Sequence, residues 1–379
     1  MSITNGTNVT NGNGASHTNG HANGHANGTN GHANGTNGHA NGANGTNGHV
    51  NGGSHENGIN GLHVDDANNN VIPVAICGMG LRLPGGNHTP QEFWQFLVNK
   101  GDGRVRVPMT RYNVSAYHET TKRPTTVATE YGYFLDESVK LGALDTSRFS
   151  MSRSDVEFSD PQQRHLLEVV TEALEDAGEA NFRGKKIGCY FGNMCEDWGE
   201  MMNRDPLWHG ANKIDGYQDW MLANRISYEF GLTGPSMTIR TACSSALTGL
   251  AEAFAAIQRG ICEGAIIAGS NLILAPGMTQ QMTEKGILSP NGSCKTFSAD
   301  ADGYARGEAF TAVFIKPLDA AIRDGNPIRA VIRSAVANSD GKTQGITQPN
   351  GYAHEAMIRL ACKQAGINVQ RGDMKKICS

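Results

Sequence analysis

Two different patterns of apolar and polar residues divide the chain near residue 70. Up to about residue 60 the sequence repeats Asn-Gly, Thr-Asn-Gly and His-Ala-Asn-Gly, with almost no large apolar side chain. Such a segment cannot bury enough apolar surface to offset the entropy lost on folding. We therefore expect residues 1–70 to form a disordered tail, whose histidines have no fixed geometry for a metal ion.

From residue 71 onward, short apolar runs alternate with stretches of helical spacing. Residues 162–177 carry apolar side chains on one helical face, and Gly178 follows them as a stop signal. Apolar strands separated by helices predict an α/β protein with a largely parallel sheet that is covered on both faces. The expected strands are residues 71–77, 186–192, 264–274, 309–316 and 328–337.

The composition narrows the class of protein. The 379 residues carry a formal net charge of −4, which does not suggest nucleic-acid binding. No apolar run reaches the ~18 residues of a membrane span, and the N-terminus lacks the profile of a signal peptide. The eight cysteines form no CxxC pairs, so neither a zinc site nor a disulfide framework is expected. We expect a cytoplasmic protein with no metal, nucleic-acid or membrane partner.

Cys243 is the most informative single residue. A Gly-Pro turn precedes a short β-branched run at residues 236–239, and residues 245–260 have the apolar spacing of a helix. The cysteine therefore lies at a predicted strand-to-helix elbow. Unpaired backbone N–H groups and the positive end of the helix dipole favour a thiolate at such a place.

The segment 231–245 reads Gly-Leu-Thr-Gly-Pro-Ser-Met-Thr-Ile-Arg-Thr-Ala-Cys-Ser-Ser and resembles the active-cysteine segment of ketosynthase domains in type I polyketide synthases. Other runs agree with the same family in the expected order, over about residues 72–368. The overall pattern is most similar to the opening domain of fungal highly reducing, iterative polyketide synthases. The matching runs are residues 74–80 with 82–86, 160–164, 223–228, 295–297, 301–308, and 338–341 with 345–347.

The resemblance implies the thiolase-like fold, in which two similar α/β halves stack in αβαβα layers. On that map residues 71–327 form the N-terminal half, and residues 328–379 are an incomplete start of the C-terminal half. Residues 371–379 do not resemble the next strand of the family. We therefore expect a truncated domain, caused by a premature stop, a shifted frame or a misplaced splice site.

The resemblance also implies decarboxylative Claisen condensation, with Cys243 as the nucleophile that takes the growing chain as a thioester. A malonyl unit on an acyl carrier protein then loses CO2, and its enolate attacks that thioester. Acyl groups arrive on the phosphopantetheine of the carrier protein or on coenzyme A. No cofactor bound by the domain itself is expected.

The two catalytic histidines of the family are not found in this sequence. The family carries them in a Glu-Ala-His-Gly-Thr-Gly-Thr segment and an Asn-Ile-Gly-His segment, and neither is present. Loss of such acid–base or electrostatic help costs roughly 10²-fold or more in rate. We therefore expect condensation to be lost. The histidines outside the tail are interpreted as ordinary surface or helix residues: His88, His118, His165, His209 and His354.

Two positions depart from the family pattern. Arg240 replaces the acidic residue that usually stands three positions before the cysteine, and Ala309 replaces a glycine. A guanidinium near the thiol would favour a thiolate, but relaxed selection in an inactive domain is the interpretation that we prefer. The family pairs the strand before the cysteine across a two-fold axis, so a homodimer through residues 236–241 is expected. Like charges of Arg240 near that axis would weaken it.

Other matched motifs are interpreted as scaffold. Asp160 and Pro161 have the signature of a helix start. Residues 302–308 resemble a glycine-containing loop that lies near the active-site entrance in the family. A structural role is the preferred interpretation for both motifs.

Three functions remain open from the sequence. The first is a truncated ketosynthase domain without condensation activity of its own. The second is an active condensing subunit that a separate polypeptide completes. The third is a non-catalytic dimerisation or binding module. An acyl thioester or acyl carrier protein would be the partner if any activity survives.

Overall fold

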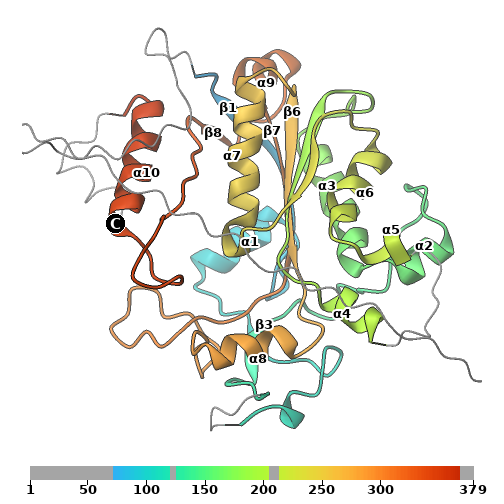
Figure 1. The fold of residues 1–379 in the computed structure, drawn as a ribbon. Helices are drawn as coiled ribbons and strands as arrows, with labels where there is room; N and C mark the ends of the chain where they lie inside the picture. The colour runs from blue at the N-terminus through green and yellow to red at the C-terminus, as the bar shows by residue number, and fades with distance from the viewer. Residues whose placement is uncertain (1–70, 120–124, 205–212, 368–379) are drawn as a thin grey trace, which may run out of the picture. The chain divides into compact units, whose positions relative to one another are not determined.

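A computed structural model describes residues 71–119, 125–204 and 213–367 (Figure 1). The tail predicted over residues 1–70 lies outside these residues, as do His209 and residues 368–379. The fold is therefore described from residue 71 onward.

A mixed sheet forms the centre of this part of the chain, with the strand order β5-β4-β6-β7-β1-β8. β4 runs parallel to β5 and to β6. β7 runs antiparallel to β6 and β1, and β8 runs antiparallel to β1. The strands span Val74–Arg82 (β1), Ile187–Gly192 (β4), Ser236–Ile239 (β5), Gly264–Asn271 (β6), Ala309–Pro317 (β7) and Ala330–Ile332 (β8).

The prediction of a largely parallel sheet is wrong for the β7, β1 and β8 side. A parallel neighbour requires a crossover that returns the chain to the opposite end of the sheet. Asn271 of β6 instead pairs with Ala309 of β7, so residues 272–308 begin and end at the same end of the sheet. Burial alternates along the first half of β7, which is the pattern of an antiparallel strand. The apolar run in the sequence did not distinguish the two directions.

Helices cover both faces of the sheet, as predicted (Figure 1). α3 (Pro161–Asp176) and α6 (Trp220–Phe230) pack on one face, over a core that includes Phe314. α7 (Ser245–Gln258) packs on the other face, where Phe254 is buried. The cysteine elbow at the start of α7 is therefore anchored by a helix that lies against the sheet.

Local sequence explains where α3 begins and how closely it packs. Oδ1 of Asp160 accepts the backbone N–H of Gln162 at 2.8 Å, and Pro161 occupies the first helical turn, which confirms the predicted helix start. Burial raises the pKa of Asp160 to about 6. A Cβ at Gly78 of β1 would lie 2.0 Å from the carbonyl oxygen of Ala173. Only glycine permits α3 to lie this close to β1.

The remaining elements are short and connect or flank these layers. β2 and β3 form a separate antiparallel pair, and the strand expected at residues 328–337 is reduced to β8. The elements are α1 (Pro90–Val98), β2 (Arg104–Arg106), η1 (Val114–Ala116), β3 (Tyr131–Tyr133), α2 (Arg153–Phe158), α4 (Asp197–Asn203), α5 (Lys213–Tyr217), η2 (Ala242–Ser244), α8 (Gly277–Glu284), α9 (Leu318–Asp324) and α10 (Gly351–Gln364).

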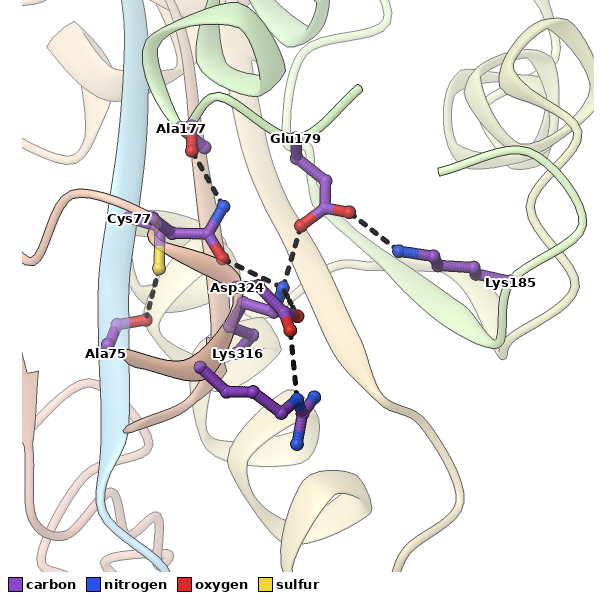
Figure 2. A network of polar contacts seen from close by, with 9 residues as sticks. Ala75, Cys77, Ala177, Glu179, Lys185, Lys316 and Asp324 are labelled. Atoms are coloured by element: carbon purple, nitrogen blue, oxygen red, sulfur yellow. Dashed lines mark hydrogen bonds and ion pairs between the residues drawn. The ribbon is translucent and has the colours of Figure 1, made fainter. Parts of the chain in front are cut away.

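A buried polar network joins β7 to the segments after α3 and α9 (Figure 2). Nζ of Lys316 donates to Glu179 and Asp324 at 2.8 Å each, and to Oδ1 of Asn326 at 2.9 Å. The second carboxylate oxygen of Glu179 accepts from Nζ of Lys185 at 2.8 Å. The side chains of Lys316 and Glu179 are 7% and 6% exposed. Every charge in the network has a partner, as buried charges require.

Candidate active site

The predicted strand-to-helix elbow around Cys243 is confirmed. β5 ends at Ile239, the 3-10 turn η2 contains the cysteine, and α7 begins at Ser245. Cys243 is exposed, whereas most of the other described cysteines are buried. The thiol therefore lies at the N-terminal end of α7, where reagents in solvent can reach it. The role of Cys243 as nucleophile stays a prediction.

Hydrogen bonds from the elbow's own side chains hold it in place. Oγ of Ser245 donates to the carbonyl of Ala242 at 2.6 Å and accepts the N–H of Thr241 at 2.9 Å. Oγ of Ser244 donates to the carbonyl of Thr241 at 2.8 Å. Ala242 has a φ of 54°, which is strained for a residue with a Cβ and persists where surrounding contacts fix the backbone. The two serines after the cysteine are therefore structural parts of the site.

Gly192 places the elbow against the end of β4. A Cβ at this position would lie 2.4 Å from the backbone nitrogen of Ala246, in the first turn of α7. The next residue, Asn193, donates its N–H to the carbonyl of Ile239 at 3.1 Å. The cysteine therefore lies where the parallel strands β4 and β5 end, the edge at which α/β proteins commonly place their reactive groups.

Tyr304 is a neighbour of the cysteine that sequence reasoning did not assign. Burial raises the pKa of its phenol, and the nearby sulfur of Cys243 raises it further. The backbone of Tyr304 is fixed by hydrogen bonds with Ile287 and Ser289. The residue belongs to the loop that was expected near the active-site entrance, and its proximity to Cys243 agrees with that placement. Tyr304 is 61 positions from Cys243 in the sequence, so local patterns could not show that the two residues lie near each other.

The Arg306-Gly307-Glu308 motif connects several segments that are distant in sequence. Glu308 is 1% exposed, and its carboxylate accepts from Nε and Nη2 of Arg111 at 2.8 and 2.9 Å. The same carboxylate accepts the backbone N–H groups of Leu135 at 3.0 Å and Ile273 at 3.1 Å. Nη1 of Arg306 donates to Oγ1 of Thr279 at 2.9 Å. These contacts agree with the structural interpretation of the motif.

Arg240 is paired with two carboxylates that sequence reasoning did not identify. Its Nη1 pairs with Glu196 and with Oδ2 of Asp219, the latter at 3.2 Å. One positive and two negative charges meet here, so the charge of Arg240 is paired within the chain. The weaker dimer and the relaxed selection expected for this position both stay predictions.

Two of the described histidines pair with carboxylates, and a third is buried. His88 lies 3.0 Å from Asp136, and His354 lies 3.2 Å from Asp340. His165 is on helix α3, as expected, but it is only 4% exposed and lies against Phe310. It is buried because the first turns of α3 lie wholly inside the protein. In residues 71–119, 125–204 and 213–367, no histidine is hydrogen-bonded to Cys243.

Comparison with known proteins defines the class to which this fold and site belong. The family model of the beta-ketoacyl synthase N-terminal domain matches residues 72–321. The chain therefore belongs to the beta-ketoacyl synthase family. Within the described residues, no helix has the length and apolar content needed to span a membrane.

Its relatives are polyketide synthases of fungi. The highly reducing polyketide synthase sphB of Aspergillus fumigatus is 57% identical over 327 residues, which cover 86% of this chain and 13% of that protein. The highly reducing polyketide synthase FUM1 of Gibberella moniliformis is 51% identical over 291 residues, or 77% of this chain and 11% of that protein. The chain thus spans a small part of the length of the relatives that it matches.

Solved ketosynthase structures confirm the predicted thiolase-like α/β fold. A mutant form of the ketosynthase from module 6 of the bacillaene synthase of Bacillus subtilis superposes with a TM-score of 0.71 at 32% identity. The match covers 78% of this chain and 49% of that chain. The oxazolomycin ketosynthase domain of Streptomyces albus also gives 0.71, at 31% identity, with 78% of this chain and 51% of that chain covered. The division into halves at residue 327 stays a prediction.

Proposed function

We propose that this chain carries out the acyl-transfer step of a ketosynthase. The Cys243 thiolate attacks the carbonyl carbon of an acyl thioester, and a new thioester forms on its sulfur. The thiolate of the carrier protein or coenzyme A leaves and takes up a proton to become a thiol. One observation carries the proposal, which is the exposed Cys243 at the N-terminal end of α7 in a chain of the beta-ketoacyl synthase family.

The subsequent condensation is proposed not to proceed on this chain alone. Loss of CO2 from a malonyl unit leaves an enolate, whose negative charge requires hydrogen-bond donors or an acid near the thioester. The described histidines His88 and His354 pair with carboxylates, and His165 is buried in α3. This arrangement supports acylation without carbon–carbon bond formation.

Intact-mass spectrometry tests both steps. After incubation with octanoyl-N-acetylcysteamine, we expect the mass of one octanoyl group on the wild-type chain and none on Cys243→Ala. Cys294→Ala, which removes the other exposed cysteine of the described residues, is the matched control and should still be labelled. Malonyl-loaded carrier protein should then give neither β-ketoacyl product nor CO2 above background. Product formed by this chain alone would contradict the proposal.

Exposed apolar side chains favour a second candidate, an active condensing subunit completed by another polypeptide. Leu247 in the first turn of α7, Phe297 and Ile346 are largely or fully exposed, although such side chains are usually covered in a stable protein. A second chain that covers them and carries the family's histidine segments would complete the site. Product formed only after such a chain is added would favour this candidate over the first.

We also propose that the chain forms a homodimer through β5, which is an edge strand of the described sheet. Pro235 and Ile239 direct their carbonyl groups to β4, so the backbone groups of Thr238 point the other way, toward the free edge. This supports pairing of two copies along residues 236–241.

Analytical ultracentrifugation of the folded chain should give a dimer at micromolar concentration. Thr238→Pro removes an N–H from the free edge and should shift the chain to monomer. Thr238→Val is the control, because it loses only the side-chain hydrogen bond to the carbonyl of Asp219 and should stay dimeric. A wild-type chain that remains monomeric at high micromolar concentration would contradict this proposal.

A further inference from the structure

Three segments of the chain meet at the guanidinium of Arg240. Nη1 pairs with the carboxylates of Glu196, before α4, and Asp219, at the start of α6. Nη2 lies 3.5 Å from the carbonyl oxygen of Met194, which follows β4. Arg240 itself is the first residue after β5. One side chain therefore connects the ends of two strands with the starts of two helices.

Hydrogen bonds to backbone carbonyl groups also attach the end of β5 to the same two segments. Oγ1 of Thr238 donates to the carbonyl of Asp219 at 2.9 Å. The N–H of Asn193 donates to the carbonyl of Ile239 at 3.1 Å. Arg240 adds its ion pairs to these contacts, just before the chain enters the elbow. We call this meeting point of residues 193–196, 219 and 238–240 the junction. Three peptide units then separate Arg240 from Cys243, so the two Cα atoms lie within about 11 Å of each other.

The junction bears on the cysteine in two ways. The elbow contains the strained backbone of Ala242, which keeps its conformation only while the flanking segments are fixed. The carboxylates of Glu196 and Asp219 would also lose their counter-charge if the guanidinium were removed, and their repulsion would separate the segments that hold the end of β5. Both effects displace Cys243 from its place at the N-terminal end of α7, so both are expected to give a slower nucleophile.

We propose that Arg240 is a positioning residue for Cys243, which fixes the elbow and compensates the charges of Glu196 and Asp219. This inference rests on the proposed function, because it assigns the junction a role in the nucleophile's reactivity. It also assigns a use to the two carboxylates, which are distant from Cys243 in sequence and match no motif.

The rate of alkylation by iodoacetamide, followed peptide by peptide with mass spectrometry, tests the proposal. Arg240→Ala should slow alkylation of Cys243 by about threefold to tenfold, the size expected for the loss of two partly exposed ion pairs. Exposed Cys294 in the same sample is the internal reference and should react at its wild-type rate. Arg240→Lys keeps the charge and should react within about threefold of wild type.

A charge reversal distinguishes an effect of the ion pairs in the junction from an effect of the charge at position 240 alone. Arg240→Asp places three carboxylates together and should slow Cys243 more than Arg240→Ala does. The double variant Arg240→Asp with Asp219→Arg restores the ion pair in the opposite direction and should recover most of the rate. A double variant as slow as Arg240→Asp alone would overturn the proposal, as would wild-type reactivity in Arg240→Ala. Thermal melts of all variants verify that each chain is folded.

Alkylation requires only an accessible thiol and no acyl transfer. The experiment can therefore contradict the proposed function and the role of Arg240 independently of each other. If octanoyl transfer is absent but Arg240→Ala still slows alkylation, only the proposed function is wrong. If octanoyl transfer occurs and Arg240→Ala changes neither its rate nor the alkylation rate, only the role of Arg240 is wrong.

Discussion

Arg111→Met is expected to lower the free energy of unfolding by about 3–5 kcal/mol, because it leaves a buried carboxylate without its counter-charge. The side chains of Arg111 and Glu308 are 6% and 0% exposed, and the pair makes two hydrogen bonds. The remaining donors to Glu308 are the backbone N–H groups of Leu135 and Ile273, which carry no full charge. Urea unfolding followed by circular dichroism measures the change.

Arg104→Met is the matched control for this variant. The Arg104 side chain is 37% exposed and lies 3.9 Å from Asp102, so its removal should cost less than about 1 kcal/mol. The double variant Arg111→Met with Glu308→Leu should recover part of the lost stability, because the uncompensated charge is gone. Equal midpoints for Arg111→Met and Arg104→Met would show that the buried pair does not stabilise this fold.

Lys316→Met is expected to cost a similar amount, about 3–5 kcal/mol at neutral pH. Methionine fills a comparable volume but leaves Glu179 with Lys185 alone and removes the donor to Asp324 and Asn326 (Figure 2). Arg323→Met is the control, since that side chain is 70% exposed and its ion pair with Asp324 is at the surface. It should change stability by less than about 1 kcal/mol.

The cost of Lys316→Met should decrease in acid. Burial acts to raise the pKa of Glu179, but hydrogen bonds and ion pairs with Lys185 and Lys316 hold it below the ordinary value of 4.5. A carboxyl with a lowered folded pKa contributes stability above its unfolded pKa, and this contribution is lost as pH falls through the folded pKa. The difference between wild type and Lys316→Met should therefore shrink below about pH 4. A difference independent of pH would assign the cost to packing.

Local features of the fold were predictable because their causes lie within a few residues. The cap at Asp160 and Pro161 fixed the start of α3, and Gly178 follows its end with a φ of 65°. The apolar spacing of residues 245–260 predicted α7, and the turn and β-branched run before Cys243 predicted β5. The elbow follows from these two elements, since a strand and a helix that are adjacent in sequence leave only a short turn between them.

Strand direction and burial of individual side chains were not predictable in the same way. A continuous apolar run is compatible with either direction, so the antiparallel placement of β7 depended on where residues 272–308 return to the sheet. The sequence placed His165 on a helix, but it did not show that the first turns of α3 are buried and that the His165 ring lies against Phe310. Neither property is encoded within a window of a few residues.

The sequence by itself determined the family, the elements that frame Cys243 and the position of the cysteine between them, because motif, capping and periodicity are local properties. The tertiary structure alone decided the partners of the charged residues. Glu196 and Asp219 lie 44 and 21 positions from Arg240, and Arg111 lies 197 positions from Glu308. Such pairs form only when sheet order and loop paths bring distant segments together. Ion pairing depends on separation in space and dielectric surroundings, neither of which the order of residues specifies.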